Sequence, residues 1–346
     1  MKTSRFRRNF TLPTIAILFC SASASAHHAN TNYDETNKVS IEGTIVKYEW
    51  HNPHVYLFVE EELDSGEKIT WSVEGQPPAI LRRMGWTRKT VKVGDEIKVN
   101  GSPGKKPERK TLLLESLEKP DESVIDMKMA AVMNSLSQAE STDKHVPSGF
   151  DGIWVTKLDM QLMMKFMNPT SLPLSEKGRE VRASFVEVKD SPAINCVANP
   201  PPMQMWTPDI KFIDVGDNTV TIQGEFDATE RTIYLNEKNH DNAKESNLGH
   251  SIGHFEGDTL IIDTTHFLSH RSGNAGGVSS GSQKHLQERL SLDKQNARLI
   301  YSFILDDPEY LDEPLSGENV EWAYRPDIEY EALPCDLENA RRFTED

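Results

Sequence analysis

The chain has 346 residues, and 38 lysine and arginine residues stand against 54 aspartate and glutamate residues, so the formal net charge is −16. Such an acidic surface repels phosphate groups. This argues against nucleic acid and anionic lipid as partners and leaves apolar or cationic small molecules open. Acidity that only keeps the protein soluble is the simpler explanation. The length exceeds that of one ordinary domain and favours two.

Residues 1–26 have the pattern of a secretory signal peptide. Three arginines precede an apolar stretch from Thr11 to Cys20, and Ala24-Ser25-Ala26 supplies the small residues that precede a cleavage site. The apolar stretch is shorter than the ~20 residues that a membrane helix needs, and no later stretch approaches that length. We therefore expect cleavage after Ala26 and a periplasmic protein without a membrane span.

Alternating apolar and polar residues predict a small barrel in residues 27–120. Three strands are expected first, then a short helix over 77–86, then two further strands. The expected strands cover 39–48, 55–59, 69–73, 96–101 and 111–117. This order of elements within about 80 residues is that of the closed five-stranded barrel called an OB-fold.

Residues 121–148 are expected to be a linker, because residues 137–149 are polar and low in apolar content, although residues 127–133 also fit a helix. Strands joined by short turns then recur through residues 149–346, which predicts an antiparallel meander. They cover 209–215, 219–226, 232–235, 251–255, 259–265, 285–292, 298–305 and 321–324. Gly152-Ile153-Trp154 at the start is typical of lipocalin-like barrels, in which the tryptophan plugs the floor and an arginine from a late strand covers it. The expected fold class is all-β, an OB-like barrel followed by a lipocalin-like antiparallel β-barrel.

Two cysteines remain after the signal peptide, Cys196 and Cys335, and each has prolines nearby. In an oxidising compartment they favour one disulfide that ties the end of the chain to an earlier loop. A thiolate metal site is the alternative. The Gly- and Ser-rich residues 273–282 are expected to form a mobile rim.

Histidines near the mature start form a candidate metal site. An N-terminal His27 has an α-amine and an imidazole that can close a chelate ring, and His28 follows it. His51 and His54 lie on a corner that Pro53 stiffens. Neutral imidazoles with an amine favour copper as Cu(II), with Zn(II) or Ni(II) behind it. A plain turn with structural histidines is the alternative.

Residues 249–267 predict a hairpin with its turn at Glu256-Gly257, which would pair His250 with Asp263. A histidine opposite an aspartate is typical of an imidazole oriented for proton transfer or ligation. On the following strand, alternation places His285 and Arg289 on one face and Glu288 on the other. Asp263 and His285 are candidate acid/base residues. The candidate ligand-binding residues are His250, His254, Thr265 and Arg289. A satisfied polar network inside or at the rim of a barrel is the alternative.

Two resemblances support export and two modules. After the His-His start, the segments EGTIVKYEWHNPHVYLFV, WSVEG and LRRMGWTRKTVKVGDEIKVNGSPGK resemble a family of exported bacterial proteins of unknown function, over residues 26 to about 118. The segments GHSIGHFEGDTLIIDTTHF, HLQERLSL, YSFILDDPEYL and PCDLENARRF resemble an uncharacterised exported bacterial β-domain. The pattern of that family emphasises Gly257, Asp258, Asp263, Thr265, His285, Glu288, Arg289, Asp307 and Pro308. His254 replaces a residue that is usually not histidine. Neither resemblance implies an activity.

The leading hypothesis is a periplasmic binding protein whose larger barrel holds a small apolar or cationic ligand, with copper at the mature N-terminus. One alternative is an enzyme that acts on a hydrophobic small molecule through Asp263 and His285. Another is a non-catalytic envelope protein that binds a protein partner.

Overall fold

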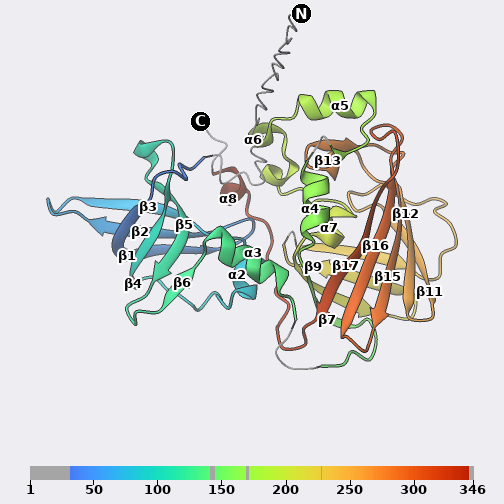
Figure 1. Ribbon diagram of the computed structural model, residues 1–346, viewed down its shortest axis with the longest axis horizontal. Coiled ribbons are helices and arrows are strands. Elements are labelled where there is room, and N and C mark those ends of the chain that lie inside the picture. Colours follow the sequence, from blue (N-terminus) through green and yellow to red (C-terminus); the bar gives the residue numbers. More distant parts are fainter. Residues whose placement is uncertain (1–31, 141–144, 169–170, 227, 343–346) are drawn as a thin grey trace, which may run out of the picture.

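The computed structural model describes residues 32–140, 145–168, 171–226 and 228–342, and it contains two β-barrels (Figure 1). The barrel formed by the first part of the chain lies on the left of the figure and the larger barrel on the right. The predicted all-β fold class, with an OB-like barrel followed by a lipocalin-like barrel, is confirmed.

The first barrel has five strands that follow the predicted alternation. They are β1 (Val39–Trp50), β2 (Val55–Glu62), β3 (Lys68–Glu74), β4 (Glu96–Pro103) and β5 (Thr111–Glu118). The strand order is β3-β2-β1-β4-β5, and a parallel pairing of β3 with β5 closes the barrel. The predicted helix is α2 (Pro78–Arg83), between β3 and β4. At a bulge in β4, a Cβ on Gly101 would lie 2.0 Å from the Leu113 carbonyl oxygen, so only glycine permits this close approach of β4 to β5.

The predicted linker, residues 121–148, contains a strand and a helix. β6 (Val124–Asp126) pairs with β5, and α3 (Met129–Ser137) follows it. Val132 and Leu136 of α3 are buried in a cluster with Leu158 of the second part of the chain. The helix overlaps residues 127–133, which also fitted a helix, whereas β6 was not predicted; few apolar residues suffice to bury one face of so short a helix.

The second barrel has nine strands. They are β7 (Gly152–Thr156), β8 (Ile210–Val215), β9 (Thr219–Gly224), β10 (Thr229–Tyr234), β11 (His250–Glu256), β12 (Thr259–Thr265), β15 (His285–Asp293), β16 (Arg298–Asp306) and β17 (Leu315–Tyr324). Their closed order is β10-β11-β12-β15-β16-β17-β7-β8-β9. One neighbouring pair departs from the expected antiparallel meander, because β10 and β11 run parallel. Parallel neighbours need a crossover rather than a tight turn, and residues 235–249 supply it. We call this segment the crossover loop.

One end of the second barrel carries short elements that periodicity did not predict. They are α4 (Met160–Met167), α5 (Glu176–Ala183), α6 (Glu187–Asp190), α7 (Met203–Trp206), and the hairpin of β13 (His270–Ala275) and β14 (Val278–Ser280). The expectation that residues 273–282 form a mobile rim is wrong for most of the segment. Buried Lys284 donates from Nζ to the carbonyl oxygens of Gly273 and Pro201, each at 2.7 Å, which anchors the hairpin.

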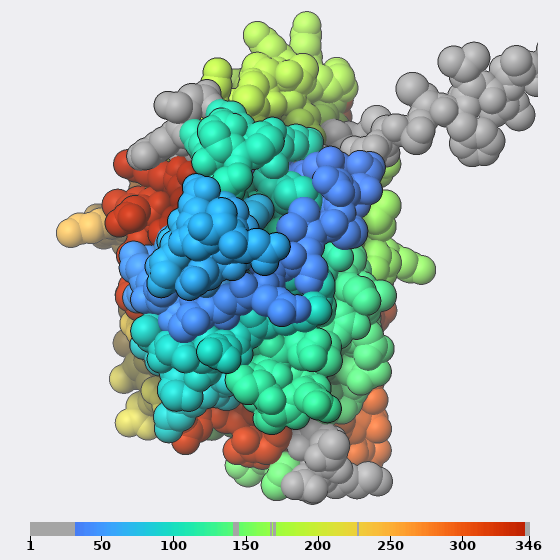
Figure 2. Space-filling view, turned by 90° about the vertical axis from the view of Figure 1, so that its left-hand side faces the viewer, coloured from blue at the N-terminus to red at the C-terminus, as the bar shows by residue number. Residues whose placement is uncertain are grey.

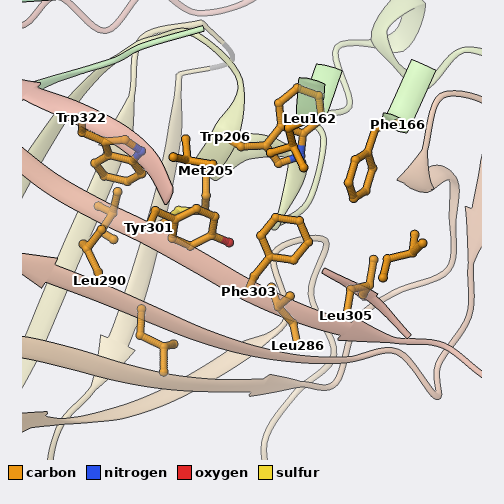
Figure 3. Packing of buried hydrophobic residues seen from close by; sticks show 14 of the residues in the cluster. Leu162, Phe166, Met205, Trp206, Leu286, Leu290, Tyr301, Phe303, Leu305 and Trp322 are labelled. Carbon is orange, nitrogen blue, oxygen red and sulfur yellow. The ribbon is translucent and has the colours of Figure 1, made fainter. Parts of the chain in front are cut away.

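Aromatic and aliphatic side chains fill the interior of the second barrel (Figure 3). Trp322, Tyr301 and Leu290 are fully buried there. Trp154 is also buried, but the ring beside it belongs to Tyr324, 5.0 Å between centroids, where an arginine was expected. Arg231 reaches into this core and is paired there with Glu288. A small ligand therefore has to be sought outside the packed interior.

The end of the chain returns to the first barrel, and Figure 2 shows this segment in red against the blue strands. The predicted disulfide joins Cys196 to Cys335, with 5.6 Å between their Cα atoms. Asn52 Nδ2 donates to the carbonyl oxygens of Leu333 (2.7 Å) and Glu225 (2.9 Å). The Asn52-Pro53-His54 corner therefore joins the two barrels and the end of the chain. None of the helices in the described part of the chain has the length and apolar composition needed to cross a bilayer.

Candidate functional site

The hairpin of β11 and β12 has a different register from the predicted one. Its turn is Gly257-Asp258, so His250 lies opposite Thr265 and Ile252 lies opposite Asp263. Gly257 has a φ of 60°, a conformation that glycine adopts at little cost in a tight turn. The predicted pairing is wrong by two residues. Because side chains alternate with a period of two, that shift leaves each residue on its predicted face.

The face that carries His250 and Asp263 is the outside of the barrel. Residues of the opposite face, such as Ser251, Leu260 and Ile262, are buried in the interior. On β15, Glu288 points inward while His285 and Arg289 point outward. The candidate acid/base residues therefore lie on the outer wall of the barrel.

The structure brings Asp263 and His285 together. His285 Nε2 lies 2.7 Å from Asp263 Oδ2, and His240 Nε2 of the crossover loop lies 2.9 Å from Asp263 Oδ1. The hydrogen bond with His285 holds the pKa of Asp263 below its usual value, and the same bond raises the pKa of His285. One carboxylate is thus held between two imidazoles, which orients both rings.

His250 extends this arrangement toward the start of the crossover loop. Its Nδ1 lies 2.8 Å from Nδ1 of His240, and its Nε2 lies 3.2 Å from Glu237 Oε2. Its ring stacks on Tyr234, with 5.1 Å between centroids. A continuous chain of polar contacts thus runs from Glu237 through His250, His240 and Asp263 to His285. We call these five residues the histidine cluster.

Sequence reasoning missed Glu237, His240 and the nearby His266. Glu237 and His240 lie in a loop, where no periodicity marks a residue as facing a strand. Their only sequence signal was the length of the segment between two predicted strands, which is long enough for a crossover. His266 directly follows β12, and alternation along that strand would place it on the face opposite to Asp263 and Thr265.

A cleft of about 690 Å³ lies beside the histidine cluster, between β10 and the crossover loop. Tyr234 and His250 line one side of it. The charged side chains that line it also include three carboxylates and one lysine: Glu230, Glu237, Asp241 and Lys244. Arg231 also borders the cleft, but its guanidinium is paired with Glu288 in the core. The lining is therefore acidic on balance.

Of the other predicted ligand-binding residues, Thr265 lies next to the cluster, whereas His254 and Arg289 do not. Thr265 Oγ1 is 2.9 Å from Nδ1 of His266, so Thr265 contacts a neighbouring imidazole. His254 and Arg289 lie nearer the turn, where each contacts Glu256, at 3.3 and 3.9 Å. Their side chains are 63% and 58% exposed, so the structure does not bring them into the cluster.

Of the predicted copper ligands, His27 and His28 lie outside the described residues. His51 is half-buried, and His54 Nδ1 lies 3.1 Å from the Gly75 carbonyl oxygen and 3.3 Å from Glu74 Oε1. Within the described ranges, no three or more histidine, cysteine, aspartate or glutamate side chains are placed to hold a metal ion as they stand.

No curated protein matches the chain. Residues 16–113, which include most of the first barrel, match the model of a family described as "Family of unknown function (DUF6152)". The predicted resemblance of the first part of the chain to a family of unknown function is therefore confirmed, and for residues 16–113 that family is DUF6152.

Proposed function

We propose that the protein binds a small cationic organic molecule in the cleft between β10 and the crossover loop. The observation that carries this proposal is the charge of the lining. Glu230, Glu237 and Asp241 outnumber Lys244, and Arg231 is neutralised inside the barrel. The volume of about 690 Å³ is in the range of small-molecule sites.

Tyr234 adds a second reason for a cationic ligand. An ammonium or guanidinium group is attracted to the face of an aromatic ring, by about 0.5–2 kcal/mol according to its desolvation. The net charge of −16 adds long-range attraction for cations and repels anions. The sequence predicted an apolar or a cationic ligand inside the larger barrel. Because side chains fill that interior, an apolar ligand there is disfavoured and a cationic ligand is better supported.

Choline and its neutral carbon analogue 3,3-dimethylbutanol test this proposal by isothermal titration calorimetry, because they differ in charge and hardly in shape. We expect choline to bind and the analogue to bind at least tenfold more weakly. Glu230→Gln and Tyr234→Leu should each weaken the binding of choline. The control is Glu318→Gln, which removes an exposed carboxylate of β17 and should leave choline affinity unchanged. Agmatine extends the test to a guanidinium group. Equal affinity for choline and its analogue, or no binding of either organic cation, would overturn the proposal.

A second candidate function is acid/base catalysis, and the 2.7 Å contact between Asp263 and His285 favours it. An imidazole that is hydrogen-bonded to a carboxylate has its tautomer fixed, which suits it to accept a proton through its other nitrogen. In this case Asp263→Ala abolishes turnover of a cleft ligand and leaves its affinity nearly intact. Catalysis would be contradicted if Asp263→Ala lost affinity for the ligand and the wild-type protein did not turn the ligand over.

We propose that the protein acts after export to the periplasm. The Cys196–Cys335 disulfide supports this, because such bonds persist in oxidising compartments. Cleavage after Ala26 and a copper chelate at His27 stay predictions.

A further inference from the structure

Three imidazoles lie close together beside the cleft, and one of them, His250, also lines it. His250 comes from β11, His240 from the crossover loop and His266 from the residue after β12. Their ring centroids are 5.1 Å (His240–His250), 5.9 Å (His240–His266) and 6.4 Å (His250–His266) apart. The side chains of His240 and His250 are only 15% and 13% exposed. Polar rings packed this closely are costly unless each nitrogen has a suitable partner.

The nitrogen atoms of His240 and His250 reveal an unbalanced contact. Each Nε2 faces a carboxylate, that of Asp263 at 2.9 Å and that of Glu237 at 3.2 Å. An ionised carboxylate only accepts hydrogen bonds, so both Nε2 atoms carry their protons and both Nδ1 atoms of the neutral rings are acceptors. These two Nδ1 atoms lie 2.8 Å apart. Two lone pairs at this distance repel each other unless a cation is bound there.

That cation is either an additional proton or a metal ion. The carboxylates that face both Nε2 atoms favour the metal ion. A histidine that donates its second N–H to a carboxylate is the usual arrangement around a bound metal, because the carboxylate fixes the ring and raises its basicity. Two histidines of the site have this arrangement, His240 with Asp263 and His250 with Glu237.

We infer that His240 and His250 bind a divalent first-row transition-metal ion through their Nδ1 atoms, with His266 as the third ligand. Imidazole suits Zn(II) and Cu(II) best among these ions. Bonds of about 2.0–2.1 Å at a tetrahedral angle place two nitrogens about 3.3 Å apart, so the two Nδ1 atoms separate by about half an ångström.

His266 has to turn for this role. Its Nδ1 lies 2.9 Å from Thr265 Oγ1, which leaves Nε2 as the nitrogen for the ion. This turn accounts for the absence of three converging donors among the described side chains as they stand. The fourth position is then available to water or to a donor in the cleft. The site is separate from the predicted chelate at His27, and its occupancy does not require the organic cation.

Zinc titration of the full mature protein, purified from the periplasm and stripped with a chelator, tests this inference. Calorimetry gives affinity and stoichiometry, and the visible absorption of added Co(II) reports tetrahedral nitrogen coordination. A His27→Ala/His28→Ala background removes the predicted terminal chelate. Within it we expect one ion per chain, with affinity at least 100-fold lower in His240→Gln/His250→Gln. The matched control is His254→Gln, which removes an exposed histidine of the same hairpin.

Asp263→Asn provides a second variant that keeps all three imidazoles. It removes the carboxylate that orients His240 and should lower the affinity for zinc about 10- to 100-fold. Equal zinc affinity in wild type and in His240→Gln/His250→Gln would overturn the inference, as would the lack of a tetrahedral Co(II) spectrum. Choline binding without zinc binding would refute the metal site and leave the proposed function intact. Zinc binding without binding of any organic cation would support the metal site and overturn the proposed function.

Discussion

The buried pair of Arg231 and Glu288 should dominate the stability of the second barrel. Their side chains are 1% and 0% exposed, and both Nη atoms of Arg231 contact the two carboxylate oxygens of Glu288. Arg231 Nε also donates to Ser251 Oγ at 3.1 Å, and Tyr301 donates to Glu288 Oε1 at 2.8 Å. Every polar atom of the carboxylate is therefore used inside a core that excludes water.

Glu288→Gln keeps the shape of this side chain but leaves the charge of Arg231 uncompensated in the core. Removal of one partner of a buried ion pair costs about 3–5 kcal/mol. That is a large fraction of the roughly 5–15 kcal/mol that stabilises an ordinary domain. Urea unfolding followed by tryptophan fluorescence measures the change, because Trp154 and Trp322 lie in the same core.

Two further variants separate this explanation from a general sensitivity of β15. Arg289→Gln removes a neighbouring exposed charge and should change the free energy of unfolding by no more than about 0.5 kcal/mol. Arg231→Met/Glu288→Leu replaces the pair by apolar side chains and should cost less than Glu288→Gln alone. The reasoning fails if Glu288→Gln costs no more than Arg289→Gln, or if the double variant is the least stable.

Three other predictions concern Glu225, the disulfide and the start of the mature chain. Burial raises the pKa of Glu225 from 4.5 to about 7 against the opposing charge of Arg82. As pH rises, Glu225 therefore loses its proton at a lower pH in the unfolded chain than in the folded protein. The free energy of unfolding falls by up to about 3 kcal/mol between pH 4.5 and pH 7. Glu225→Gln should flatten that part of a chemical-denaturation pH profile, and an unchanged slope would refute the assignment. Reduction of Cys196–Cys335 should lower stability by about 2–5 kcal/mol in the same assay, whereas no change would mean that the closed loop contributes nothing. Intact-mass spectrometry of the periplasmic protein should place its first residue at His27, and another start would remove the amine chelate.

Local periodicity was enough to place most strands of both barrels, because a half-buried strand repeats every two residues wherever it lies. The same period placed His250 and Asp263 on one face of the hairpin. It did so even though the hairpin turn was misassigned, since a shift of two residues preserves the faces. The disulfide followed from the number of cysteines and the expected compartment.

The tertiary structure decided which face of β11, β12 and β15 is the interior, because both faces carry polar residues and alternation alone does not distinguish them. Glu288 is therefore part of the core, while His285 belongs to the outer wall. It also decided that β10 and β11 run parallel, and the crossover between them carries His240 and Glu237 over the hairpin. A loop has no repeating pattern that records its neighbours, since its path depends on the strands that it joins and on side chains far away in the chain.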